Sequence, residues 1–435
     1  MSSSIDPTSM TVSHSTDSAR LDYLDATWAF ALVLGIVFHA CLSFTPTFMG
    51  WAVQDVSTSP LVAMFITVSH SFRMGTFFLI AGFLSHRTFH RNGPGDFVRS
   101  RLLRLGVPFV VGWFLLHPLV VSGWILGSAS LRGHVDVLGG LVGGFQSLAT
   151  LPKGLFTGSP LWFLYYLAMI TALTLAVRGL VRTTGPWHVV GIRRADALVA
   201  GLAKSPVSPV ILAIPTAAAL WFMRFWGIDT PDQSLVPQLP PLVVYGSAFV
   251  LGWMLSRQSA MLSQITRLTP LRWTLAGLGT ATVLLVGDIE RDPGNPRYVS
   301  AHLAYALGYS LTLWSLAFLT IGIFRKLSAR PNVFVRYVAD SSYWMYLFHL
   351  PIVVWLQVAV AELPLHWSLK LILISIITIG LSLLTYDLFV RSTFIGWMLN
   401  GRRRERVMAP WLLASLGRLS IRGTSGALKL GKELS

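Results

Sequence analysis

Apolar residues occur in long, almost uninterrupted runs from Ala26 onward, separated by short polar segments. Each run approaches or exceeds the roughly 20 residues that a helix needs to cross the hydrocarbon core of a bilayer. The pattern therefore predicts an all-α, polytopic bundle of about ten transmembrane helices. The predicted spans are residues 26–45, 61–86, 106–127, 160–178, 209–227, 239–256, 270–288, 299–324, 340–361 and 368–390.

Basic residues between the predicted spans alternate in number from one connection to the next. The second, fourth, sixth and eighth connections together carry 15 Lys and Arg, whereas the other five together carry 4. Basic residues accumulate in the cytoplasmic connections of membrane proteins. The alternation therefore predicts that both chain ends are cytoplasmic.

The two ends of the chain differ from its central part. Residues 1–20 are rich in Ser and Thr and have no apolar run, which is typical of a disordered lead. They also lack the pattern of a secretory signal. Residues 401–435 form a basic tail that either lies on an anionic leaflet or serves only as a topology anchor. We therefore expect a transmembrane domain at 21–400 between this lead and this tail.

Composition supports the membrane assignment. Hydrophobic residues make up 53% of the 435 residues, and charged residues only 12%, about half of what a soluble domain carries. The net charge of +16 is explained by cytoplasmic connections, so we expect the lipid bilayer as a partner and no nucleic acid. The lone cysteine, Cys41, excludes an intrachain disulfide and a cysteine-based metal cage. We expect no metal and no bound cofactor.

Four titratable residues lie at similar depth inside the predicted spans. His39 is in the first span, His70 and Arg73 share a face of the second, and His349 is in the ninth. Their distances from the cytoplasmic helix ends come to roughly 15–24 Å. Such groups are costly in a bilayer and are functional candidates. A neutral imidazole can take a proton from a hydroxyl and return it to a leaving group, although each histidine could instead be a hydrogen-bonded packing residue.

Further polar residues extend this set. Arg73 suits an anionic group or a developing oxyanion, or is a structural counter-charge. Arg101 and Arg104 share a helical face at the start of the third span, where they either hold phosphate groups or simply flank the membrane. Ser342 and Tyr346 lie on the same stripe of the ninth span as its histidine.

The segments around these residues resemble a known family. They are LDYLDATWAFALVLGIVFHACLSF at 21–44, HSFRMGTFFLIAGFLS at 70–85, FVRSRLLRLGVP at 97–108, PLWFLYY at 160–166, SSYWMYLFHLP at 341–351 and YDLFVRSTFIGWMLNGR at 386–402. This ordered set resembles the acyltransferase-3 superfamily of membrane O-acyltransferases, especially its glucan biosynthesis protein C branch. It runs through nearly the whole chain.

The resemblance implies an enzyme of the bacterial inner membrane. It would move an acyl group from cytoplasmic acyl-CoA, either succinyl-CoA or acetyl-CoA, to a hydroxyl of a periplasmic glucan or other polysaccharide. In the glucan branch the group would be succinyl, and a glucan synthase is a possible partner. The family's functional residues fall on His39, Arg101, Arg104, Ser342, Tyr343 and His349. Trp162 and Trp51 offer aromatic surface for a sugar.

One position departs from the family pattern. The family has a basic residue eleven positions before its histidine, and here that position is Trp28. Eleven residues are about three turns, so Trp28 lies below His39 on the same face, nearer the cytoplasm. A tryptophan can stack but carries no charge. Either the arginines already named suffice, or the donor differs, or activity is weakened or lost.

Two other functions fit the same residues. A transporter or flippase for a glycan or lipid-linked intermediate would use buried His and Arg to bind and relay protons, without acyl transfer. The uncharged Trp28 favours this function, whereas no corresponding halves are visible in the sequence. An inactive relative that scaffolds a glucan synthase is the third possibility.

Overall fold

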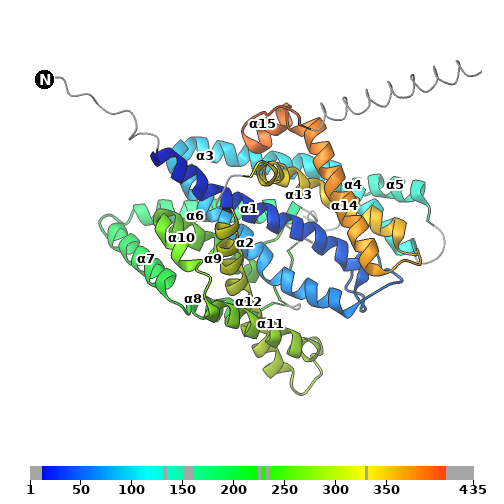
Figure 1. Ribbon diagram of the computed structural model, residues 1–435, viewed down its shortest axis with the longest axis horizontal. Helices are drawn as coiled ribbons and strands as arrows, with labels where there is room; N and C mark the ends of the chain where they lie inside the picture. The colour runs from blue at the N-terminus through cyan, green and yellow to red at the C-terminus, as the bar shows by residue number, and fades with distance from the viewer. Residues whose placement is uncertain are drawn as a thin grey trace, which may run out of the picture.

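The structure is a computed structural model that describes residues 12–130, 135–149, 161–223, 227–231, 235–328 and 332–407. The described residues contain helices and no strand, as predicted. The helices are α1 (Val12–Cys41), α2 (Pro60–Asn92), α3 (Pro94–Arg101), α4 (Val107–Ser130), α5 (Val137–Gln146), α6 (Trp162–Arg182), α7 (Trp187–Lys204), α8 (Ser208–Leu220), α9 (Leu239–Arg257), α10 (Ser259–Ile265), α11 (Pro270–Glu290), α12 (Tyr298–Leu327), α13 (Val333–Val360), α14 (Trp367–Thr385) and α15 (Phe394–Asn400) (Figure 1). A 3₁₀ turn at Leu42–Phe44 and two π-helical turns at Leu102–Gly106 and Tyr386–Val390 complete the elements.

Eight helical segments of the described residues are long and apolar enough to cross a membrane. The bent pair α7 and α8, with an angle of 117° between its helices, would add a ninth. α8 covers most of the predicted span at 209–227. α11 covers the predicted span at 270–288 but is not among the eight, because Gly, Thr and the charged Arg272 and Glu290 make it less apolar. A multi-pass helical bundle is therefore confirmed, whereas the number ten is not.

Local sequence signals explain where the long helices begin. Ser59 caps α2 by accepting a hydrogen bond from the backbone N–H of Leu61, and a proline follows at the first helical position. Asn332 caps α13 in the same way. Gly93 ends α2 with a φ of 82°, a value that favours glycine, and Pro94 starts α3.

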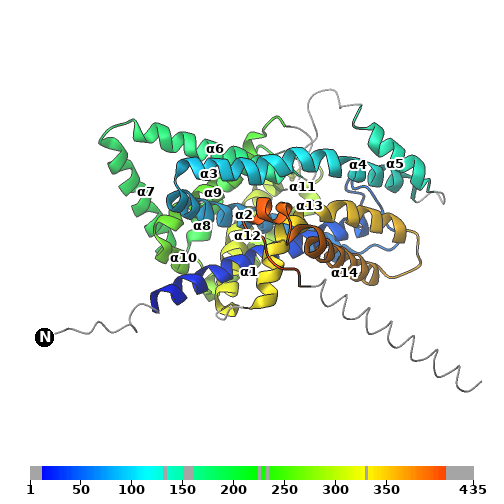
Figure 2. The same ribbon diagram turned by 90° about the horizontal axis from the view of Figure 1, so that it is seen from above.

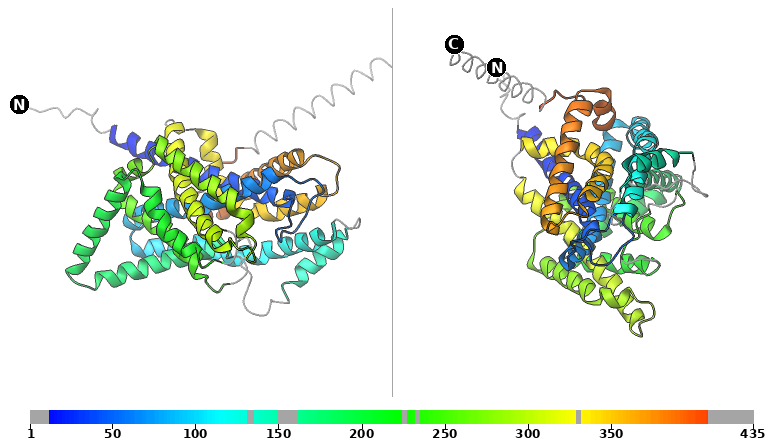
Figure 3. Two further views of the ribbon diagram at one scale, coloured as in Figure 1. Left: turned by 90° about the horizontal axis from the view of Figure 1, so that it is seen from below. Right: turned by 90° about the vertical axis from the view of Figure 1, so that its right-hand side faces the viewer.

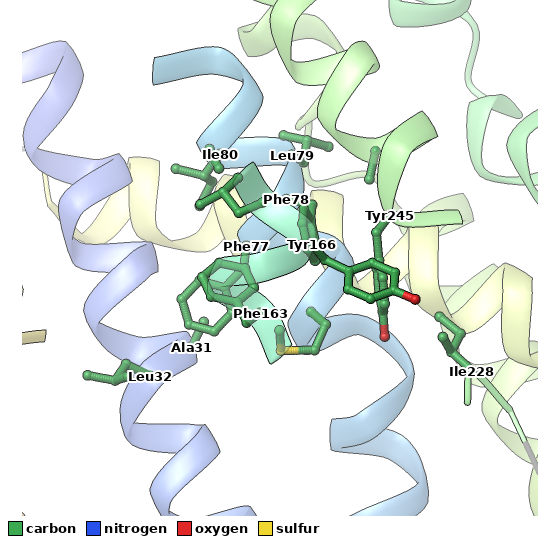
Figure 4. Close-up of a cluster of buried hydrophobic side chains, with 14 of the residues drawn as sticks. Ala31, Leu32, Phe77, Phe78, Leu79, Ile80, Phe163, Tyr166, Ile228 and Tyr245 are labelled. Carbon is green, nitrogen blue, oxygen red and sulfur yellow. The ribbon is translucent and has the colours of Figure 1, made fainter. Parts of the chain in front are cut away.

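Small residues let the helices approach closely. A Cβ at Gly82 of α2 would overlap the backbone carbonyl of Phe249 in α9, and a Cβ at Gly252 would overlap that of Leu79. Close backbone approach through small residues is a common way for membrane helices to pack. Aromatic side chains of α2, α6 and α9 fill the space beside this contact (Figure 4).

The central helices α1 and α2 lie between two flanks. One flank holds α14 and α15 and the other holds α11 (Figures 1 and 3). α7 closes one end of the long axis and α5 lies at the opposite end (Figure 2). α1 packs against α2, α12, α13 and α14, so residues that are far apart in sequence meet around it.

The structure describes only part of each chain end. α1 begins at Val12, so residues 12–20 of the predicted lead are helical, while residues 1–11 lie outside the described residues. Residues 401–407 of the predicted tail are mostly exposed, and the backbone N–H of Val407 donates to Asp387; residues 408–435 lie outside the described part. The division into lead, domain and tail stays a prediction. Cys41 is a buried free thiol.

Candidate active site

A cavity of about 130 Å³ lies between α1, α2, α6 and α13. α1 contributes side chains from its C-terminal half, α2 from its middle, α6 from its first turn and α13 from one face. The predicted site residues that line it are His39, His70, Arg73, Trp162, Ser342, Tyr346 and His349. The chain fold thus brings together residues separated by more than 300 positions. We call this space the outer cavity.

His39 lines the outer cavity and contacts other rings of its wall. Its ring centroid lies 5.3 Å from that of His349 and 5.7 Å from that of Trp51, which stacks on it at 25°. Its Nδ1 is buried and has no hydrogen-bond partner among the described residues. The imidazole is therefore placed by ring contacts and keeps polar capacity for a further group.

His349 has a defined tautomer because of its backbone contacts. Its Nδ1 lies 2.8 Å from the carbonyl oxygen of Tyr346 and 3.0 Å from that of Met345. A carbonyl only accepts, so Nδ1 carries the proton and Nε2 is left as the basic nitrogen. Ser342 donates to the carbonyl of Ala339 at 2.6 Å, one turn earlier on the same helix.

The two polar residues of α2 differ in how they are held. The Nδ1 of His70 is 2.8 Å from the hydroxyl of Tyr309, which ties this ring to α12. The guanidinium of Arg73 lies 4.2 Å from the centre of the Phe38 ring, as in a cation–π contact. Its Nη1 is buried without a hydrogen-bond partner among the described residues. Arg73 is thus a buried cation with free hydrogen-bonding capacity at the cavity.

A second cavity of about 760 Å³ lies on the cytoplasmic side of the first, according to the predicted orientation. We call it the inner cavity. Arg101 ends α3 and donates to the Ser85 hydroxyl at 2.8 Å, and Arg104 lies in the π-helical turn that follows. Such turns frequently occur at functional sites. The other basic residues of its lining are His86, Arg87, His90 and Arg91.

The charged residues that line the two cavities are those expected around an anion and not around a cation. No Asp or Glu of the described residues lines either cavity, whereas arginine lines both. A cleft lined by charge of one sign concentrates ligands of the opposite sign. The arrangement therefore favours an anionic ligand.

Trp28, the position that departs from the family pattern, lies where the two cavities meet. It lines both of them, and its ring makes an edge contact with Phe77 at a centroid distance of 4.8 Å. His117 lines neither cavity and instead stacks on Trp113 at 4.8 Å.

Sequence reasoning missed Gln357 on α13. Its side-chain nitrogen donates to the carbonyl oxygens of His39 and Ala40 at 2.9 and 3.1 Å, and its oxygen accepts from the indole of Trp51 at 2.9 Å. It therefore joins the backbone of the central histidine to the ring that stacks on it. An amide in the otherwise apolar last part of this helix, residues 351–360, was the signal that could have found it.

A buried ion pair fixes the connection that carries Trp51. Lys370 of α14 lies 2.7 Å from a carboxylate oxygen of Asp55, and both side chains are almost fully buried. Burial raises the pKa of Asp55, and the hydrogen bond from Lys370 acts in the opposite direction. The sequence analysis did not single out this lysine, although a charge inside a predicted span was the signal for it.

These features define a class of protein: a multi-pass helical membrane protein with a histidine-containing cavity next to a cationic one. A family model described as an acyltransferase domain, of the acyltransferase-3 type, matches residues 21–387. The chain belongs to this acyltransferase family.

Curated relatives agree with the family. The chain is 22% identical to glucans biosynthesis protein C of Escherichia coli (strain K12) over 398 residues, which cover 89% of this chain and 97% of that protein. It is also 22% identical to the protein of the same name from Escherichia coli O139:H28 over 401 residues, with the same coverage. No solved structure matches the chain.

Proposed function

We propose that this protein is an O-acyltransferase that moves an acyl group from acyl-CoA at the cytoplasmic face to a hydroxyl of a glucan or other polysaccharide at the periplasmic face. It would cross the bacterial inner membrane ten times, with both ends cytoplasmic. The observation that carries the proposal is the meeting of a cationic cavity and a histidine-containing cavity at Trp28. Family membership supports the reaction class.

The inner cavity suits the nucleotide part of the donor. Coenzyme A carries several phosphate charges, and arginine binds phosphate through charge-assisted, forked hydrogen bonds. Arg101 and Arg104 would hold these groups, with the other basic residues of the inner cavity adding attraction. The thioester would then extend past Trp28 toward His39, which lies about 16 Å further along the helix.

His39 would act as the base in the transfer. The acceptor oxygen attacks the thioester carbonyl carbon while the imidazole takes the hydroxyl proton. The carbon–sulfur bond then breaks, and the departing CoA thiolate takes that proton from the imidazolium. A brief acyl-histidine on the same side chain is the alternative route. The basic Nε2 of His349, in the neighbouring ring, would stabilise the imidazolium or relay the proton.

Arg73 would select the acyl group. A succinyl group ends in a carboxylate, and the buried guanidinium with an unpaired nitrogen is a matching partner for it. An acetyl group has no such charge. We therefore propose succinyl-CoA as the preferred donor, with Trp162 and Trp51 contacting the sugar.

The reaction is tested by incubating purified protein with succinyl-CoA or acetyl-CoA and an isolated glucan, and measuring CoA release and acylated glucan by mass spectrometry. Acylated glucan supports the proposal. Cells lacking the protein should make unsubstituted glucan in normal amounts, because the enzyme only modifies it. Loss of whole periplasmic glucan, without any transfer in the purified system, would instead support the transporter.

A further inference from the structure

The inner and outer cavities are separated by a thin aromatic wall. Only Trp28, Phe163 and Tyr343 of the described residues line both cavities. They come from α1, α6 and α13, so three helices contribute to the wall. We call these three side chains the barrier.

Ring contacts connect two members of the barrier, Trp28 and Phe163, to neighbouring rings, and together they involve four helices. Trp28 contacts Phe77 at 4.8 Å, Phe77 contacts Phe163 at 5.8 Å, and Phe163 contacts Tyr346 at 5.7 Å between centroids. Figure 4 shows the rings of Phe77 and Phe163 side by side next to the helix that carries Ala31 and Leu32. Close-packed rings leave little room for water, and apolar constrictions of this kind stop ions.

The three members of the barrier are held to different degrees. The hydroxyl of Tyr343 donates to the backbone carbonyl of Arg104, which ties it to the inner cavity. Phe163 contacts rings on α2, α6 and α13 and is only 5% exposed. Among the described residues, Trp28 contacts a single ring, that of Phe77. Trp28 is therefore held by fewer ring contacts than Phe163, and no hydrogen bond within the described part of the chain ties it to the inner cavity as one ties Tyr343.

A site open to both faces of a membrane needs such a wall. Moving one elementary charge across a potential of 100 mV changes its energy by about 2.3 kcal/mol, so an open path would dissipate the gradient. Both cavities are lined by cationic residues and would admit small anions.

We propose that the barrier seals the passage between the inner and outer cavities and that Trp28 is the gate, displaced only when the acyl-bearing arm of a donor passes through. The identity of the arm rests on the proposed function, whereas the seal does not. Trp28 would thus close the passage, whereas a basic residue at this position would bind a charged group.

Cysteine accessibility tests the seal directly because the chain has one native cysteine. In a Cys41→Ala background, Ser342→Cys places a thiol in the outer cavity and Ser259→Cys places one in the inner cavity. A charged methanethiosulfonate reagent is applied to one face of sealed vesicles at a time, with no donor or acceptor present. The face from which the reagent labels the Ser259→Cys thiol is defined as the inner face.

With Trp28 intact, reagent at the inner face should leave the Ser342→Cys thiol unmodified. Trp28→Ala should raise this labelling rate by about tenfold or more, since the apolar constriction is removed, and Trp28→Phe should keep it low. Labelling of the same thiol from the outer face should not change, which shows that the variants are folded. If Trp28→Ala is not labelled from the outer face, Phe163→Ala replaces it in the same comparison.

Rapid labelling from the inner face with Trp28 intact would overturn the proposal. So would unchanged slow labelling in both folded alanine variants. An intact seal in a protein that transfers no acyl group would contradict the proposed function and leave the barrier established.

Discussion

The two cavities differ in size and in the kind of polar group that they contain. The inner cavity is about 760 Å³ and is lined by four arginines, whereas the outer cavity is about 130 Å³ and holds one arginine among histidines and aromatic rings. Permanent charges near the membrane surface cost little, while groups deeper in the bilayer are stable chiefly when they can be neutral. This division suits the proposed function, in which the inner cavity would bind a bulky anion and the outer cavity would carry out proton transfer.

The largest effect is expected from loss of the central imidazole. His39→Ala should lower kcat by about 10²–10⁴-fold, the usual contribution of general acid–base catalysis, while the KM for the donor stays nearly unchanged. The measurement is steady-state CoA release with saturating glucan. His117→Ala is a matched control, because that histidine lines neither cavity. A variant at position 39 that keeps most of its kcat would remove the histidine from the chemistry.

Replacing the inner arginines should have the opposite kinetic signature. Arg101→Gln or Arg104→Gln should raise the KM for acyl-CoA by about 10–100-fold each, because a hydrogen bond to a charged group contributes about 1.5–3 kcal/mol. The kcat should change little. Arg99→Gln on the same helix is the control, since Arg99 is exposed and does not line the cavity. A fall in kcat at constant KM would contradict the assignment of donor binding to these arginines.

Arg73 allows the outer cavity to be tested for selectivity. Arg73→Gln should lower kcat/KM for succinyl-CoA about tenfold or more relative to acetyl-CoA, because one charge-assisted hydrogen bond to the carboxylate is lost. Parallel assays with the two donors give the ratio. Equal losses with both donors would assign Arg73 to the oxyanion instead and contradict its role in donor choice.

The smallest effect is expected at Gln357. Gln357→Met should lower kcat by about 2–10-fold, in line with neutral hydrogen bonds worth about 0.5–1.5 kcal/mol, and leave donor KM unchanged. Trp51→Phe keeps the stacked ring but loses the hydrogen bond to Gln357. If the amide acts through that ring, the free-energy loss of the double variant should be smaller than the sum of the two single losses. Strictly additive effects would separate the two residues.

Several parts of this arrangement could be predicted from sequence because they depend on depth and helical spacing. Counting residues along antiparallel helices predicts that His39, His70 and Arg73 lie at similar depth, and three helical turns put Trp28 below His39. Similar depth also predicts that His39 and His349 can approach each other. In the structure their ring centroids are 5.3 Å apart.

Other parts depend on long-range packing, which has no local sequence signal. The hydrogen bond from Tyr343 to the Arg104 carbonyl joins residues 239 positions apart. The contacts of Gln357 with His39 span 318 positions. The aromatic wall forms only because side chains from separate helices meet at one height. The π-helical turn that contains Arg104 has no Gly or Pro at its start to mark it in the sequence. The number of transmembrane helices could not be predicted reliably for a related reason. The length of an apolar run alone does not show whether a helix such as α11 crosses the membrane.

The division of labour between the cavities is tested most directly by transfer across a sealed membrane. Purified protein is reconstituted in proteoliposomes in one orientation, with succinyl-CoA on the side of the inner cavity and glucan on the opposite side, and His39→Ala vesicles serve as the control. We predict that succinylated glucan accumulates on the side opposite the donor and that the His39→Ala vesicles form almost none. Product formed only when donor and glucan share one side would contradict a reaction that joins the two cavities through the membrane.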